Sequence, residues 1–198
     1  DHTDEAFKHL NKVKYLKDSH SNFNEQFIRT LVLLGKFEKA FSFSKEVWAE
    51  DKYFFEADLL LGLQSLINED YILAKRHFDR LNTIPQYNFF LEDFFGNALL
   101  SWNEASKNNM TDSFKFLEKI PSRYETLKKI QNSFLHCYFD TPDAQTTFEK
   151  LIEGEESRFS RYNFFLVNYL LSKNKKEEAK NAIDLITKLY SSNILIKQ

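Results

Sequence analysis

The chain has 198 residues, of which 42% are hydrophobic and 28% are charged, and its formal net charge is −2. It contains four glycines and three prolines against 21 phenylalanines. So few turn-forming residues disfavour an all-β protein, whose many short strands need many tight turns. The chain has a single cysteine, so it cannot form an internal disulfide. It has no run of about 18 apolar residues that would predict a membrane-spanning helix. It also lacks the excess of basic residues that is typical of nucleic-acid-binding proteins. We therefore expect a soluble all-α protein of the cytoplasm or the periplasm.

In chain order, the apolar periodicity predicts eleven helices joined by short turns. Their ranges are 3–17, 22–34, 37–49, 53–68, 71–83, 87–107, 111–120, 122–139, 142–153, 157–173 and 176–190. The first helix is an N-terminal half repeat, and the ten helices that follow it pair into about five hairpins. We expect these units to stack into a single solenoid, a right-handed α-α superhelix. The expected units are 1–20 for the half repeat, then 21–54, 55–88, 89–124, 125–159 and 160–193.

The second helix of each unit repeats one pattern with a period near 34 residues. A small residue is followed four and seven positions later by other residues, mostly apolar, which form one face of an α-helix. The small residue lets the first helix approach closely, and the larger ones fill the space towards the next unit. The three columns are Ala6, Ala40, Ala74, Met110, Ala144 and Ala179, then Leu10, Ser44, Phe78, Phe114, Phe148 and Ile183, and last Val13, Val47, Leu81, Leu117, Leu151 and Ile186.

Both ends of the sequence favour a piece of a longer repeat protein. The segment TDEAFKHLNKV, residues 3–13, matches a second helix whose first helix is missing. The segment DLITKLYSSNILIKQ, residues 184–198, stays apolar, whereas solenoids need polar capping faces for solubility. We therefore expect exposed terminal helices that can form a homo-oligomer.

The repeat units resemble degenerate tetratricopeptide repeats, and the composition is similar to that of bacterial members of this family. The resemblance is clearest in two segments, FIRTLVLLGKFEKAFSF at 27–43 and ADLLLGLQSLINEDYILAKRHF at 57–78. The family's first-helix tryptophan is replaced by Asp58 and Glu92. The matching positions are the Leu61–Gly62 pair, the turn aromatics Phe37 and Tyr71, the small residues Ala40 and Ala74, and the second-helix aromatic Phe78. The resemblance implies a stack of helical hairpins that binds other proteins.

The sequence lacks the motifs that carry catalysis or metal binding. The four glycines are too far apart for a phosphate-binding loop, and neither G-x-S-x-G nor H-E-x-x-H occurs. The adjacent His136 and Cys137 would point about 100° apart on a helix, so they would not share a ligand. We expect no enzyme activity, no catalytic residue, no metal and no cofactor.

The resemblance implies a concave groove lined by the first helices, which holds a peptide or a partner helix. Leu59, Leu63 and Phe90 would form its apolar floor. Acidic side chains at Glu25 and Asp93 would repel a carboxylate, which disfavours a clamp for C-terminal tails. The candidate groove residues are Arg29, Glu56, Leu59, Leu63, Phe90, Asp93, Asn97, Lys129, Ser133, Arg161, Phe164 and Asn168.

The leading interpretation is therefore a non-catalytic protein-interaction scaffold. The alternative is an assembly module that self-associates or docks through its end faces, and the mass in solution would distinguish the two. RNA binding by a related helical repeat would need a basic groove and a base-reading pair in each unit, and the sequence provides neither. No membrane insertion and no nucleic-acid partner are expected.

Overall fold

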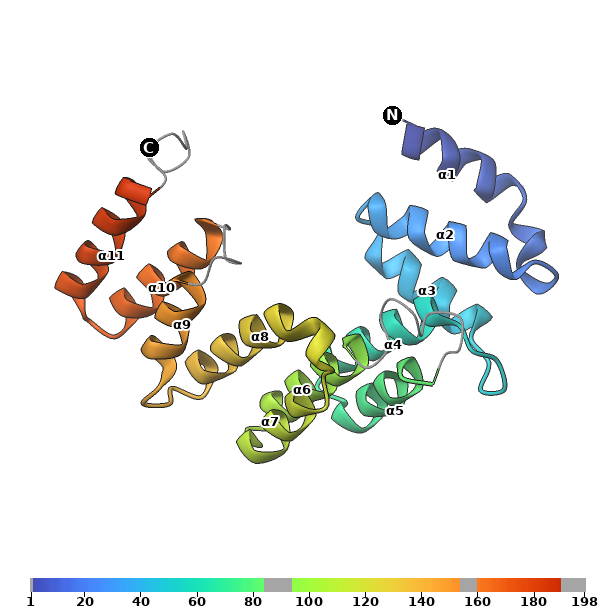
Figure 1. Ribbon diagram of the computed structural model, residues 1–198. Helices are drawn as coiled ribbons and strands as arrows, with labels where there is room; N and C mark the ends of the chain where they lie inside the picture. Colours follow the sequence, from blue (N-terminus) through green and yellow to red (C-terminus); the bar gives the residue numbers. More distant parts are fainter. Residues whose placement is uncertain (1, 84–93, 154–159, 190–198) are drawn as a thin grey trace. The chain divides into compact units, whose positions relative to one another are not determined.

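The computed structural model describes residues 2–83, 94–153 and 160–189. Over these ranges the chain contains eleven α-helices and two short 3₁₀ helices, with no strand (Figure 1). It divides into two compact units, residues 1–119 and residues 120–198. The predicted all-α class is thus confirmed, while the boundaries of the individual repeat units stay a prediction.

The first unit consists of a helix packed on α2 and three successive helical hairpins, α2 with α3, α4 with α5, and α6 with α7. Each second helix also packs on the first helix of the next hairpin, as in α3 with α4 and α5 with α6. Its elements are α1 (His2–Lys12), η1 (Lys14–Asp18), α2 (Ser21–Leu33), α3 (Phe37–Val47), α4 (Phe55–Ile67), α5 (Tyr71–Leu81), α6 (Phe95–Ser106) and α7 (Met110–Glu118).

The second unit contains two hairpins, α8 with α9 and α10 with α11, and α9 also packs on α10. Its core gathers around Phe148, Leu166 and Leu170. Its elements are η3 (Ser122–Tyr124), α8 (Glu125–Tyr138), α9 (Ala144–Glu153), α10 (Ser160–Ser172) and α11 (Lys176–Leu189).

The observed helices follow the predicted ones with a few local differences. The helix expected over 3–17 ends at Lys12, and the 3₁₀ helix η1 follows it. The helix expected over 122–139 begins with the 3₁₀ turn η3 before α8 starts at Glu125. The first residues of the helices expected over 87–107 and 157–173 lie outside the described residues.

All five hairpins turn in the same way. The second residue after each first helix has a positive φ of 52° to 66°. The backbone N–H of the residue that follows it bonds to the carbonyl five residues earlier, as in Lys36 to Leu31 at 2.8 Å. This is the Schellman motif, which satisfies carbonyls that the helix end leaves unpaired. The positive-φ residues are Gly35, Glu69, Asn108, Asp140 and Asn174.

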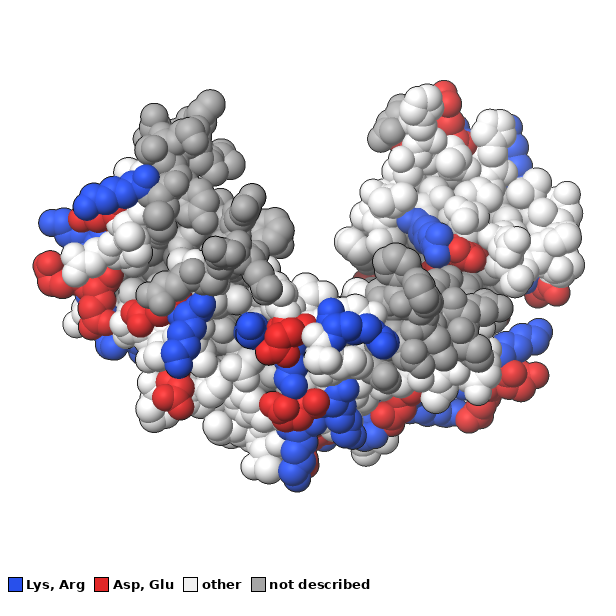
Figure 2. Space-filling model, in the orientation of Figure 1, with Lys and Arg blue, Asp and Glu red and all other residues white. Residues whose placement is uncertain are grey.

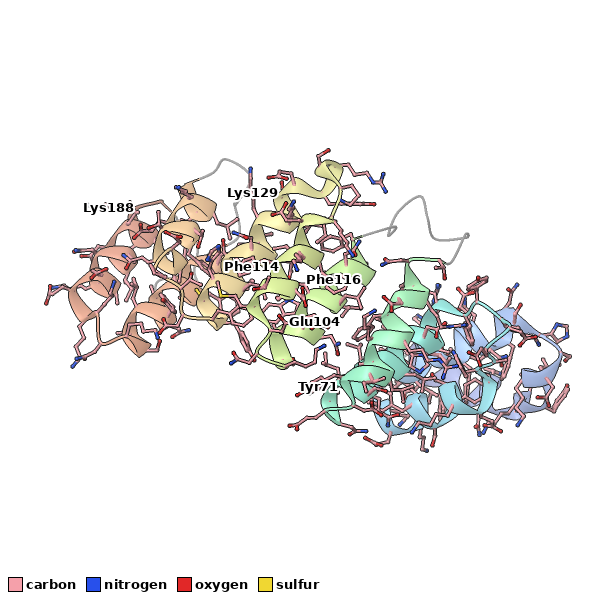
Figure 3. The ribbon with its side chains drawn as sticks, turned by 90° about the horizontal axis from the view of Figure 1, so that it is seen from below. Tyr71, Glu104, Phe114, Phe116, Lys129 and Lys188 are labelled. Atoms are coloured by element: carbon pink, nitrogen blue, oxygen red, sulfur yellow. The ribbon has the colours of Figure 1, made fainter. Side chains whose placement is uncertain are left out.

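The small-residue column is confirmed in four hairpins and is wrong in α7 and in α1, where Ala6 is exposed. Ala40, Ala74, Ala144 and Ala179 are buried, whereas Met110 is 43% exposed. In α7 the buried small residue is Ser113, followed by Leu117 and Ile120. The register is therefore three residues later than the sequence pattern suggested, and Phe114 (Figure 3) does not occupy the second column.

The N-terminal caps of α5 and α7 mark the starts from which the two helices can be compared. The side chain of Asn109 accepts a hydrogen bond from the backbone N–H of Asp112 at 3.3 Å, and Asp70 does the same for Leu73 at 3.1 Å before α5. Both caps stand four residues before the small buried residue of their helix. The small buried residue of α7 thus stands at the same distance from its N-cap as in α5, which the spacing of apolar residues alone did not indicate.

Gly62 allows the close approach of α4 and α5 that the sequence predicts. A Cβ at this position would clash with the ring of Phe78, which is fully buried, and would lie 3.2 Å from Cβ of His77. Since a buried ring has no free space to move into, close packing outweighs the cost of about 1 kcal/mol for glycine inside a helix.

Candidate partner-binding groove

A surface groove of about 380 Å³ lies between α2 and α4, which are the first helices of successive hairpins. Its floor contains the buried Ile28 and Leu60, and its rim includes Leu33, which is 77% exposed. An exposed leucine beside an apolar floor gives a ligand apolar area to cover. We call this the α2–α4 groove, and its lining residues are Ile28, Arg29, Val32, Leu33, Phe55, Glu56, Leu59 and Leu60.

The spacing of apolar residues explains why two helices form one groove. Ile28 and Val32 are four residues apart on α2, and Phe55 and Leu59 are four residues apart on α4, so each pair lies on one helix face. The neighbouring face of α2, with Phe27 and the buried core around it, packs towards α1 and α3 instead. Two apolar stripes from successive first helices thus meet side by side.

A charged bridge crosses the two helices at this groove. Arg29 on α2 donates two hydrogen bonds to Oε1 of Glu56 on α4, at 3.0 Å from Nε and 2.7 Å from Nη2. Its guanidinium also pairs with Glu25 one turn earlier, at 2.6 Å. Two carboxylates therefore surround one guanidinium, so the bridge has a local formal charge of −1 and fixes α2 against α4.

A buried polar cluster stands directly behind the groove, and sequence reasoning missed it. Asp58 is fully buried on α4 and accepts hydrogen bonds from Trp48 Nε1 at 2.8 Å, from His77 Nδ1 at 2.9 Å and from Arg80 Nε at 2.9 Å. We call these four residues the Asp58 cluster. Arg80 also donates to the backbone carbonyl of Glu50 at 2.8 Å. The cluster thus ties the segment between α3 and α4 to α5.

One signal in the sequence could have indicated this cluster. Asp58 is an acid in the otherwise apolar stretch ADLLLGL, at the position where the resembling family has its tryptophan. A buried carboxylate needs donors nearby, and a tryptophan, a histidine and an arginine occur at 48, 77 and 80. The sequence separation of 10 to 22 residues hides their proximity until the helices are packed.

The structure brings three of the predicted groove residues together in the first unit. Arg29, Glu56 and Leu59 all line the α2–α4 groove. Leu63, one turn further along α4, packs against the core around Ala74 and Phe78. Asn97 on α6 is buried, while Phe90 and Asp93 lie outside the described residues.

The remaining predicted residues belong to the second unit. Lys129 is exposed on α8 (Figure 3), whereas Ser133 is 2% exposed and donates to the carbonyls of Lys129 and Thr147 within the α8–α9 hairpin. Phe164 and Asn168 are exposed on α10. The side chain of Arg161 lies outside the described residues, and a groove shared by all twelve residues stays a prediction.

The described residues offer little for other kinds of site. No group of three or more His, Cys, Asp or Glu side chains in them could hold a metal ion. None of their helices is both long enough and apolar enough to cross a bilayer. Basic and acidic side chains are interspersed over the face shown in Figure 2.

The adjacent His136 and Cys137 are both half-buried on α8. His136 Nδ1 lies 2.6 Å from Oγ1 of Thr141, and burial lowers the pKa of the imidazole. Burial also raises the pKa of the Cys137 thiol to about 11, which keeps it protonated at neutral pH. A protonated thiol is a poor nucleophile and a poor metal ligand.

Comparison with known proteins identifies the fold. No protein-family model and no curated protein matches the sequence. Among solved structures, the chain is similar to YrrB, described as a TPR protein with an unusual peptide-binding site, with a TM-score of 0.53. The match covers 93% of this chain and 94% of YrrB at 14% sequence identity. The chain therefore has the helical-repeat fold of tetratricopeptide proteins, as its sequence resemblance predicted.

Proposed function

We propose that the chain is a non-catalytic protein-interaction scaffold that binds a peptide or partner helix in the α2–α4 groove. The observation that carries this proposal is an apolar groove of about 380 Å³ between two successive first helices. Its size is within the usual range of ligand sites, and its apolar lining with one charged bridge suits a bulky apolar side chain. The description of YrrB as peptide-binding adds support from a protein of the same fold.

The bridge of Arg29, Glu25 and Glu56 defines one end of the proposed site. Its net negative charge disfavours a carboxylate and favours a peptide whose apolar residue is followed by a neutral or basic one. Because the bridge is already paired, it orients the ligand more than it adds affinity. The apolar rim at Leu33 therefore supplies most of the binding free energy.

This proposal can be tested by selecting peptides that bind the chain from a random library displayed on phage. The affinity of the selected peptides is then measured by calorimetry. Leu33→Asp should weaken their binding about tenfold or more, because burying a leucine contributes about 1.5–3 kcal/mol. Ile72→Asp on α5 is the matched control, since Ile72 is 87% exposed and does not line the groove. Selected peptides that bind both variants equally well would refute the groove assignment.

Self-association is a second candidate, favoured by exposed apolar side chains on the last helix. Ile183 and Leu185 on α11 are 46% and 52% exposed. These two side chains lie two positions apart on the helix and point to different sides, and each offers apolar area that a second copy can cover. Light scattering coupled to size exclusion distinguishes the candidates, because an assembly module has a dimeric or larger mass that Ile183→Lys reduces.

A further inference from the structure

A second groove, of about 300 Å³, lies between α1 and α3, with α2 at its bottom. It goes beyond the proposed function because it shares no residue with the α2–α4 groove. The buried Phe27, Leu31 and Phe43 form its floor, and the half-buried Phe7 forms part of its wall. We call it the α1–α3 groove, and its lining residues are Phe7, Asn11, Lys14, Phe27, Leu31, Lys39, Ser42, Phe43 and Glu46.

Three phenylalanine rings give the groove an aromatic interior. The rings of Phe7 and Phe27 are stacked, with centroids 6.1 Å apart and an interplanar angle of 11°. The rings of Phe27 and Phe43 meet edge to face, with centroids 4.7 Å apart. A further ring between Phe7 and Phe43 adds edge or offset contacts of the kind that aromatic side chains favour.

Ammonium groups surround this aromatic interior. Lys14 Nζ lies 5.5 Å from the centroid of the Phe43 ring, and Lys36 Nζ lies 5.5 Å from that of the Phe7 ring. The single lining carboxylate, Glu46, already pairs with Lys14 at 3.5 Å and with Lys17. Of the charged lining residues, Lys14 and Lys39 stand against Glu46, so the formal charge of the lining is +1 in a chain whose net charge is −2, and Lys36 adds a further ammonium group beside Phe7.

We propose that the α1–α3 groove binds an acidic segment of a partner protein that inserts an aromatic side chain between Phe7 and Phe43. Carboxylates that flank the aromatic residue meet Lys14, Lys36 and Lys39, which supplies charge complementarity. The aromatic side chain replaces water over the apolar floor. The groove is lined by four elements of one unit, α1, η1, α2 and α3, which limits the occupant to a short segment.

Fluorescence anisotropy of the whole chain with a labelled peptide, Asp-Glu-Phe-Asp-Glu-Asp, tests this inference. We expect saturable binding with a Kd below about 1 mM that weakens between about 50 mM and about 500 mM salt. Replacing the peptide's Phe by Gly should abolish it. A peptide with Lys at every acidic position, and a single-stranded RNA, should not bind.

Protein variants locate the binding site on the molecule. Lys39→Glu should weaken binding about fivefold or more, because a rim attraction becomes a repulsion. Ser42→Trp should block the groove sterically. Lys45→Glu, on the same helix but outside the lining, and Leu33→Asp, in the other groove, are the controls and should leave the Kd within about twofold.

Each result decides the inference, provided that circular dichroism shows each variant to be folded. Loss of binding with Lys39→Glu and Ser42→Trp alone supports it. It is overturned if the acidic peptide does not bind, if the two controls weaken binding equally, or if the basic peptide or the RNA binds as well. Loss with Leu33→Asp alone would move the acidic ligand to the α2–α4 groove.

Discussion

Asp58→Asn should destabilise the first unit far more than the removal of an exposed carboxylate such as that of Asp79. The carboxylate is fully buried and accepts hydrogen bonds from Trp48, His77 and Arg80. Asparagine keeps the shape but removes the charge and replaces one acceptor by a donor. Removing one partner of a buried ion pair costs about 3–5 kcal/mol, because it leaves Arg80 without its counter-charge.

This cost should be visible as a lower midpoint of thermal unfolding, followed by far-ultraviolet circular dichroism. For a chain of this length, each kcal/mol shifts the midpoint by about 2–4 °C, so the expected decrease is about 6–20 °C. Asp79→Asn is the matched control, since Asp79 is on α5, half exposed, and pairs with Lys75 at 2.6 Å. Its loss should stay within about 1 kcal/mol. Equal destabilisation by the two variants would refute the reasoning that the Asp58 cluster supports the fold.

Three further predictions concern other positions. Gly62→Ala should lower the free energy of unfolding by about 1–3 kcal/mol in urea titrations despite alanine's better helix propensity, because its Cβ would clash with Phe78. Cys137, with its pKa raised to about 11 by burial, should react with iodoacetamide about two orders of magnitude more slowly than a free cysteine near pH 8, with a rate that still rises about tenfold per pH unit. The folded-state pKa of His136 is lowered by burial, so its contribution to stability is present above the usual pKa near 6.5 and is lost as the pH falls through the folded value. An NMR titration midpoint of His136 at or above 6.5 would contradict this.

The sequence allowed most of the helices to be located because their apolar faces repeat with the helical period. The register error in α7 shows the limit of that signal. Met110, Phe114 and Leu117 form a valid i, i+4, i+7 stripe, and so do Ser113, Leu117 and Ile120. Both stripes share Leu117, so periodicity alone cannot choose between them. The structure distinguishes them, because Ser113 is fully buried whereas Met110 is 43% exposed.

The lining of the α2–α4 groove could be anticipated only in part, for a different physical reason, and binding of a partner by these residues stays a prediction. A register position on a first helix indicates which way a side chain points, and this was enough for Arg29, Glu56 and Leu59. It does not indicate how deeply the neighbouring helix covers that position. Ser133 has an equivalent register on α8, yet its hydroxyl is buried against α9 and donates to Thr147.

Helix α2 presents a different face to each groove. Phe27 and Ile28 are consecutive, so their side chains diverge by about 100° around the helix, one towards the α1–α3 groove and one towards the α2–α4 groove. Because the two sets of lining residues have no member in common, two ligands can occupy them without displacing each other. A partner that carried both an acidic aromatic segment and an apolar one would bind the second segment intramolecularly. Such linkage can raise affinity about 10²- to 10⁴-fold without any new contact, provided that its linker spans the distance over α2.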